Sequence, residues 1–191
     1  MAEQIEIEYK TLLTAEQFQA IKAKYAPNQA AFVQENYYFD TPHFDLKHKH
    51  CGLRIRRTEN SAECTLKTPL SEGLLETTDK LTIQEAEEWL SAKKVPNQGS
   101  VADKLTALDI PLSELQLLAQ LKTARIQIVL PIGELALDES WYGNNHDYEL
   151  ELEVSEAMQG KQDFLNLLEE FQIDYQPAKN KIVRAFEATI V

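Results

Sequence analysis

The chain has 191 residues, which is the length of one domain and enough to bury an apolar core without disulfides or a structural metal. Its composition, 43% apolar and 26% charged with 6 Gly and 7 Pro, excludes collagen-like, low-complexity and disordered chains. The net charge of -12 opposes binding to duplex nucleic acid or to an anionic membrane surface, so we expect neither as a partner.

Signals for export, membrane insertion and domain boundaries are missing from the chain. The longest apolar stretches fall short of the roughly 20 residues that a membrane span needs, and the first ten residues, MAEQIEIEYK, do not resemble a leader peptide. The cysteines, Cys51 and Cys64, lack metal or redox spacing, so reduced thiols are expected. Without repeats or linkers, residues 1–191 are predicted to form one soluble, cytoplasmic domain.

Alternating hydropathy predicts about eight strands. In the first, residues 5–13, Ile5 and Ile7 share one face while Glu6 and Glu8 share the other. The same two-residue period predicts strands at 32–40, 53–57, 63–67, 124–130, 133–138 and 148–154, with a weaker segment at 74–81.

Helices are predicted between these strands. Each start is marked by a side chain that can cap a free backbone N–H: Thr14 with Gln17, Thr82 with Glu85, and Ser100 with Asp103. Apolar stripes at helical spacing follow in residues 18–25 and 164–171. Residues 82–121 are interpreted as a helical insertion between strands, and residues 178–187 as a short final helix.

The charged strand faces are expected to point into the fold. In most antiparallel sheets such a face meets water, but here the helices have apolar stripes that would cover the apolar faces instead. The charges are also sorted by sign. The carboxylates are Glu6, Glu8, Asp138, Glu149, Glu151 and Glu153, and the cations are Arg54, Arg56, Lys67 and Arg125.

This sorting indicates two kinds of ligand. Like charges two residues apart on one strand face lie about 7 Å apart and repel unless a counter-ion separates them. Oxygen-only clusters suit Mg²⁺, Mn²⁺ or Ca²⁺ rather than zinc. Arg54 and Arg56 offer two guanidinium forks for phosphate oxygens. A closed sheet with these linings would accept a metal-bound polyphosphate.

Several short motifs occur in one order along almost the whole chain. They are residues 6–10 (EIEYK, an ExExK pattern), 38–41 (YFDT), 53–56 (LRIR) and 65–67 (TLK), followed by Arg125, Asp138, residues 151–153 (ELE) and Lys181. This set resembles the CYTH superfamily, also called triphosphate tunnel metalloenzymes, and looks most like its bacterial YjbK-like branch.

The resemblance implies an α+β fold in which an eight-stranded antiparallel β-barrel with flanking helices forms one CYTH domain over residues 1–191. It implies a small-molecule triphosphate as substrate and Mg²⁺ or Mn²⁺ as cofactor. Metal binding or water positioning is implied for Glu6, Glu8, Asp138, Glu151 and Glu153. Phosphate binding is implied for Lys10, Arg54, Arg56, Lys67, Arg125 and Lys181.

Some residues depart from this pattern or extend it. Arg184 lies one helical turn after Lys181 and is expected to join the phosphate-binding set. Many family members carry a basic residue and then an acid after the fourth strand, whereas this chain has residues 76–79 (ETTD), which leaves the role of Glu76 open. Glu149 could be a solvated residue at the tunnel mouth, and Arg57 is out of phase and expected outside the barrel.

The leading hypothesis is hydrolysis of inorganic triphosphate, thiamine triphosphate or a nucleoside triphosphate. Lys10, Arg54 and Arg56 are expected to be catalytic, because prepositioned cations stabilise the charge that spreads over phosphoryl oxygens in the transition state. An adenylate cyclase and a non-catalytic sensor of polyphosphate or nucleotide are the alternatives. RNA 5′-triphosphatase activity is less attractive because of the net charge.

Overall fold

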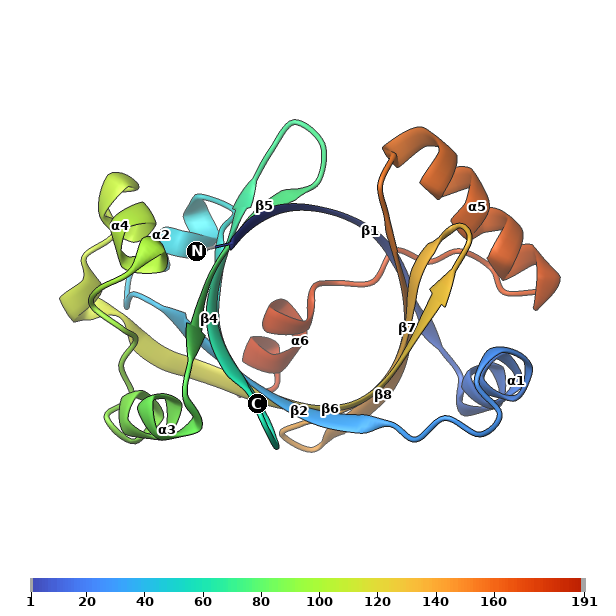
Figure 1. Cartoon of the computed structure of the whole chain (residues 1–191), viewed down its shortest axis with the longest axis horizontal. Helices are drawn as coiled ribbons and strands as arrows, with labels where there is room; N and C mark the ends of the chain where they lie inside the picture. The colour runs from blue at the N-terminus through green and yellow to red at the C-terminus, as the bar shows by residue number, and fades with distance from the viewer. Residues whose placement is uncertain (1, 190–191) are drawn as a thin grey trace.

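Eight antiparallel strands close into a barrel in the computed structural model, which describes residues 2–189. The strands are β1 (Ala2–Leu13), β2 (Phe32–Asp40), β3 (Gly52–Thr58), β4 (Ala62–Pro69), β5 (Leu74–Leu81), β6 (Gln116–Leu130), β7 (Gly133–Tyr142) and β8 (Asn145–Val154). They follow one another around the barrel in the order β1-β5-β4-β3-β2-β6-β7-β8. Figure 1 shows the ring end-on, with helices on two opposite sides. The predicted barrel with flanking helices is confirmed.

Every predicted strand is present, but β6 begins earlier than the sequence indicated. The sequence predicts a helical insertion that includes residues 116–121, whereas these residues begin β6 and pair with β2, from Gln116 opposite Asp40 to Leu121 opposite Asn36. Barrel closure explains the difference, because β2 would otherwise have an unpaired edge along this stretch. Long-range pairing therefore overrides the ambiguous local pattern LQLLAQ.

The helices are α1 (Ala15–Tyr25), α2 (Asp45–His48), α3 (Ile83–Ser91), α4 (Ser100–Ala107), α5 (Ala157–Glu170) and α6 (Lys181–Glu187), with a 3-10 turn at Leu112–Glu114. The capping boxes at Thr14 and Thr82 are confirmed. The predicted cap at Ser100 is wrong: Asp79 of β5 accepts hydrogen bonds from the backbone N–H of Ser100 at 3.2 Å and of Val101 at 2.8 Å. The helices within residues 2–189 are all too short or too polar to span a bilayer.

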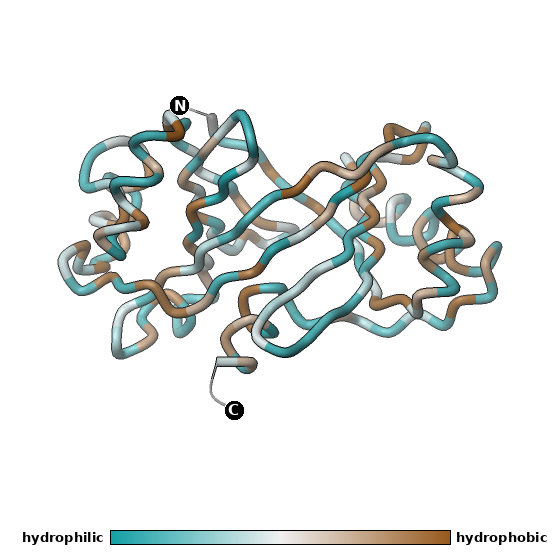
Figure 2. The backbone as a smooth tube through the Cα atoms, turned by 90° about the horizontal axis from the view of Figure 1, so that it is seen from below, coloured by the Kyte–Doolittle hydropathy of each residue, from teal (hydrophilic) through white to brown (hydrophobic). Residues whose placement is uncertain are grey.

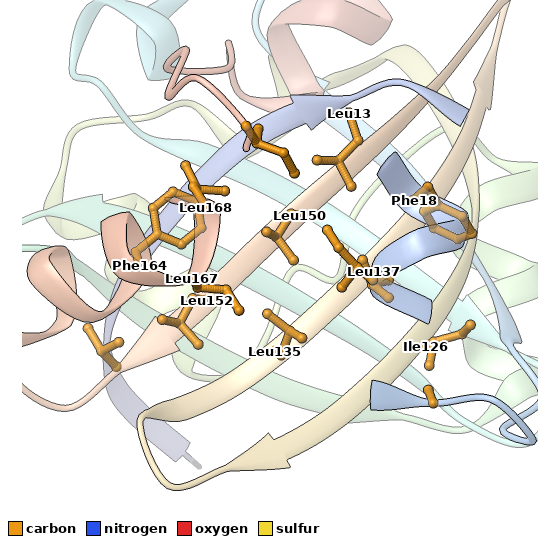
Figure 3. Close-up of a cluster of buried hydrophobic side chains, with 14 residues drawn as sticks. Leu13, Phe18, Ile126, Leu135, Leu137, Leu150, Leu152, Phe164, Leu167 and Leu168 are labelled. Carbon is orange, nitrogen blue, oxygen red and sulfur yellow. The ribbon is translucent and has the colours of Figure 1, made fainter. Parts of the chain in front are cut away.

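The main apolar cores lie outside the barrel, between its outer surface and the helices. Phe18 of α1 and Phe164 of α5 pack with Leu150 and Leu152 of β8 in the cluster of Figure 3. A second cluster joins β3 and β4 to α3 and α4. Burying each such Leu or Phe contributes about 1.5–3 kcal/mol. Figure 2 shows hydrophilic and hydrophobic residues alternating along the strands, so with the apolar face turned outward the charged face points inward.

Helix α6 is different, because it lies within the ring seen in Figure 1. Its Ala185 is buried in a small cluster with Tyr38 of β2 and with Ala119 and Leu121 of β6. These strand residues belong to the inward-facing set, so α6 packs against the inner wall. The first residue of α6, Lys181, is thereby brought into the interior of the barrel.

Candidate functional site

A cavity of about 390 Å³ lies inside the barrel and is lined by charged side chains. Six of the predicted phosphate-binding residues line it: Lys10, Arg54, Arg56, Lys67, Arg125 and Lys181. Four of the predicted metal-binding residues also line it: Glu6, Glu8, Glu151 and Glu153. The structure therefore brings these side chains into one tunnel, because each belongs to the inward-facing set of its strand or to the first turn of α6.

Glutamates gather where β1, β7 and β8 meet. Glu8 lies opposite Glu153 across β1 and β8, and Glu134 lies opposite Glu153 across β7 and β8. Like charges directly opposite one another destabilise a sheet. Burial, followed by repulsion from Glu6 and Glu134, raises the pKa of Glu153. This part of the tunnel therefore favours a bound cation.

Glu76 also belongs to the tunnel. Its carboxylate lies 2.9 Å from the Lys67 ammonium, which also bonds to Glu6, and 3.7 Å from the Arg54 guanidinium. Burial acts to raise the pKa of Glu76, but attraction to Lys67 and Arg54 outweighs it and lowers the pKa. The role left open by the sequence is thus to hold two of the predicted phosphate-binding cations in place.

The β3 side of the tunnel has positive charge with few acceptors. Arg56 Nε donates to Asn36 at 3.0 Å, while the nearest carboxylate, that of Glu63, is 3.6 Å away. Burial, together with repulsion from Arg54 and Arg125, lowers the pKa of Arg56 to about 10. The buried Nε of Arg54 has no hydrogen-bond partner among residues 2–189. An anion bound beside Arg54 and Arg56 would neutralise their charge and accept their free hydrogen bonds.

Asp138, Glu149 and Glu151 form a second acidic group, which we call the carboxylate cage. One ligand oxygen of each lies within 4.8 Å of the others, and all three residues are buried. The Lys181 ammonium contacts all three, at 2.8 Å from Asp138 and 2.6 Å from Glu151. Arg125 donates two bonds to Asp138, at 2.7 and 2.6 Å, and one to Glu151 at 2.5 Å.

The cations of the cage lower the pKa of two of its three acids, whereas burial outweighs them at Glu149 and raises the pKa of that residue. Burial acts to raise the pKa of both Asp138 and Glu151, but attraction to Arg125 and Lys181 outweighs it and lowers the pKa of each. Asp138 is fully buried behind these two cations rather than at the cavity surface. Glu149 is also fully buried, so it is not a solvated residue at the tunnel mouth.

Arg184 lies apart from the cavity surface. Its guanidinium contacts Asp147 and lies 2.7 Å from Glu149, and its Nε donates to the carbonyl oxygen of Lys179 at 3.0 Å. With every guanidinium nitrogen engaged, Arg184 anchors α6 to β8. The structure therefore does not bring it together with the predicted phosphate-binding residues. Arg57 lies outside as expected, paired with Glu35 at 2.6 Å.

Several tunnel residues were not singled out from the sequence. They are Gln34, Glu63 and Glu134. Each follows the two-residue phase of its strand, Glu134 with Asp138 and Glu63 with Lys67, so strand phase alone could have found them. Gln34 is almost fully buried, and its Nε2 has no hydrogen-bond partner among residues 2–189, which adds a second free donor to the tunnel.

The carboxylates of the tunnel are suited to a hard divalent cation. Both acidic groups offer only oxygen ligands, which Mg²⁺ and Mn²⁺ prefer. The Oε1 atom of Glu149, a residue of the cage, is buried without a hydrogen-bond partner among residues 2–189, while its Oε2 contacts Lys181 and Arg184. A cation bound there would satisfy this atom.

Comparison with known proteins agrees with this architecture. A protein of Bacillus subtilis strain 168 named "Putative triphosphatase YjbK" is 40% identical over 188 residues, which cover 98% of this chain and 97% of that protein. A crystal structure of a "putative adenylate cyclase" from Bacillus halodurans is 38% identical, with a TM-score of 0.91 over 97% of this chain and 100% of that one.

A third relative shares the fold at lower identity. It is the structure of a Hippeastrum protein named "Putative adenylyl cyclase HpAC1", 24% identical, with a TM-score of 0.79 over 97% of this chain and 96% of that one. The family model for the CYTH domain matches residues 4–186. The chain therefore belongs to the CYTH domain family.

Proposed function

We propose that residues 1–191 act as a single cytoplasmic enzyme domain that hydrolyses a small-molecule triphosphate, with Mg²⁺ or Mn²⁺ as cofactor. The substrate is inorganic triphosphate, thiamine triphosphate or a nucleoside triphosphate. The observation that carries this proposal is the weak counter-charge around the buried Arg56: its nearest carboxylate, Glu63, is 3.6 Å away, and burial together with Arg54 and Arg125 lowers its pKa to about 10. A polyphosphate anion would remove that electrostatic cost.

The names of two relatives point to two reactions of a triphosphate. The Bacillus subtilis protein, at 40% identity over nearly the full length of both chains, bears the name of a triphosphatase. The Bacillus halodurans protein, at 38% identity, bears the name of an adenylate cyclase. An adenylate cyclase is therefore the second candidate. Both reactions use a bound triphosphate and differ in whether water or the ribose hydroxyl attacks.

In the proposed reaction the cations of the tunnel hold the phosphate oxygens. Arg54 and Arg56 of β3 and Lys10 of β1 face the same cavity, and the paired strands hold them in place. Phosphoryl transfer passes through a loose transition state with negative charge spread over several oxygens. Because these cations are already in position, they stabilise that charge without reorganisation, which is the main contribution expected from the protein.

The acidic residues would hold the metal and the attacking water. The oxygen ligands come from three consecutive strands of the wall: Glu6 and Glu8 of β1, Glu151 and Glu153 of β8, and Asp138 of β7. A bound divalent cation supplies charge neutralisation and a lowered pKa for coordinated water.

The test is product analysis with inorganic triphosphate, ATP and thiamine triphosphate, each with Mg²⁺ and Mn²⁺. We expect metal-dependent release of phosphate, and the relative rates rank the substrates. Cyclic AMP together with pyrophosphate would establish the cyclase instead. Tight binding without turnover of any substrate would contradict both enzymatic functions and leave the non-catalytic sensor.

A matched pair of variants tests the role of the tunnel. Arg56→Ala should reduce kcat by about 10²-fold or more, the scale measured when one preorganised donor to the transition state is removed. Arg57→Ala, one residue further along β3, removes an arginine that pairs outside the tunnel with Glu35 and Glu87, so its activity should stay near that of the wild type. Equal activity of the two variants would refute the tunnel assignment.

A further inference from the structure

The carboxylate cage already contains a cation, the ammonium of Lys181. Within residues 2–189, three cations contact the cage, and of these only Lys181 reaches all three carboxylates, Asp138, Glu149 and Glu151. Arg125 contacts two of them, and Arg184 contacts only Glu149. The ammonium therefore occupies the position that a metal ion would take between the same oxygens.

The charges around the cage nearly balance without any ion. The three cage carboxylates, together with Asp147, which shares Arg184, face three cations, Lys181, Arg125 and Arg184, so a divalent cation added to this arrangement would leave one excess positive charge in a buried site. Such an excess is strongly unfavourable at low local dielectric constant. One of the three cations has to leave before a metal can bind.

Lys181 is the cation that can leave. Arg184 has every guanidinium nitrogen engaged and does not line the cavity, and Arg125 is held on Asp138 by two bonds. Lys181 has a flexible side chain and already lines the tunnel that contains Arg54 and Arg56. A phosphate group in that tunnel would offer its ammonium an alternative set of acceptors.

We propose that Lys181 is a resident counter-cation of the carboxylate cage, displaced when a divalent metal enters, so that one side chain couples metal binding to triphosphate binding. The metal takes the ligand oxygens of Asp138, Glu149 and Glu151, while the released ammonium turns to the phosphate. Glu149 thereby becomes a metal ligand. By linkage, triphosphate and metal each strengthen binding of the other by the same factor. The inference rests on the proposed function only in taking a triphosphate as the anion.

The counter-intuitive consequence is that removing this lysine improves metal binding. Binding of Mn²⁺ to the protein without triphosphate can be followed by the loss of the free-ion signal in electron paramagnetic resonance. We expect Lys181→Met to bind Mn²⁺ about tenfold more tightly than the wild type, equivalent to about 1.4 kcal/mol. Lys181→Arg, which retains the positive charge, should bind no more tightly than the wild type.

Two further variants locate the effect. Lys179→Met removes an exposed lysine two residues away that pairs with Glu187, and it should leave the Mn²⁺ affinity unchanged. Adding Glu149→Gln to Lys181→Met should abolish the gain, because the metal loses one cage ligand. A gain that survives in the double variant places the metal elsewhere and overturns the proposal, as does an affinity of Lys181→Met equal to that of the wild type.

Circular dichroism checks that the variants fold. If Lys181→Met does not fold, chemical labelling of the wild-type protein tests the proposal instead. Amine-labelling followed by peptide mass spectrometry should find Lys181 protected, since its side chain is only 11% exposed, and Lys179 reactive. Adding Mn²⁺ should increase labelling of Lys181 alone. No increase at a metal concentration that saturates the protein would overturn the proposal. Because neither assay contains triphosphate, a wild-type protein that hydrolyses none leaves these results intact.

Discussion

Replacing Arg184 by Met tests whether this residue anchors α6 or binds phosphate. Its side chain is 7% exposed, and it contacts the fully buried carboxylate of Glu149 as well as Asp147. Removing one partner of a buried ion pair costs about 3–5 kcal/mol. Because Lys181 still neutralises Glu149, we expect the lower end, a loss of about 3 kcal/mol in the free energy of unfolding.

Urea denaturation measures this loss. With a slope of about 2 kcal/mol per molar, the midpoint should fall by about 1.5 M. The matched control is Arg57→Met, whose partners Glu35 and Glu87 are 36% and 58% exposed. Such a surface pair contributes about 0–1 kcal/mol, so its midpoint should shift by less than about 0.5 M.

The same variant distinguishes the sequence-based expectation from the geometry. If Arg184 binds phosphate, Arg184→Met raises KM for the triphosphate and leaves the urea midpoint unchanged. If it anchors α6, the midpoint falls, and Arg184→Lys restores part of the stability through one charged contact. An unchanged midpoint with an increased KM would refute the anchoring role.

Three more predictions follow from local features. Asp79→Ala should destabilise the protein by about 1 kcal/mol through loss of the α4 cap, whereas Ser100→Ala should have little effect; equal urea midpoints would contradict this cap. At pH 8 a disulfide reagent should react with Cys51 in the native protein and with both thiols after unfolding. Cys64 is protected in the native protein because it is buried, and burial, Asp79 and Glu63 raise its pKa to about 12. Reaction of both thiols in the native protein would contradict the burial of Cys64. Stability should rise as the pH falls from 7 toward 4.5 and decrease again at lower pH, and Glu153→Gln should diminish that rise in urea denaturation measured at each pH.

The sign of that pH dependence follows from two sets of carboxyls. Glu6 and Glu153 have a pKa raised above the ordinary 4.5, so the folded state takes up their protons first and stability rises as the pH falls toward 4.5. Asp138 and Glu151 have a lowered pKa, so they contribute stability that is present above their ordinary values of 3.8 and 4.5 and is lost as the pH falls further. A steady decrease from pH 7 to pH 4 would contradict the raised pKa values.

The sequence by itself determined that the eight strands exist, though not where β6 begins, and it determined the inward direction of their charged faces and two of the helix caps. The two-residue period of a strand shows which side chains share a face of the sheet. The apolar stripes of the helices indicate that the helices cover the apolar face. Arg54, Arg56, Glu6 and Glu8 could be assigned to the tunnel for that reason. The caps at Thr14 and Thr82 were predictable because each depends on residues three positions apart.

Only the tertiary structure decided which charged residues become partners. Barrel closure and the inward packing of α6 bring Lys181 to Glu149 and Arg184 to Asp147, across separations that no local pattern records. The cap of α4 likewise comes from Asp79 of β5, although α3 lies between β5 and α4 in the sequence. The two-residue period of a strand specifies whether a side chain points into or out of the barrel. The strand register and the closure of the barrel specify which charged side chains lie next to it. The charge balance of the cage depends on these neighbours.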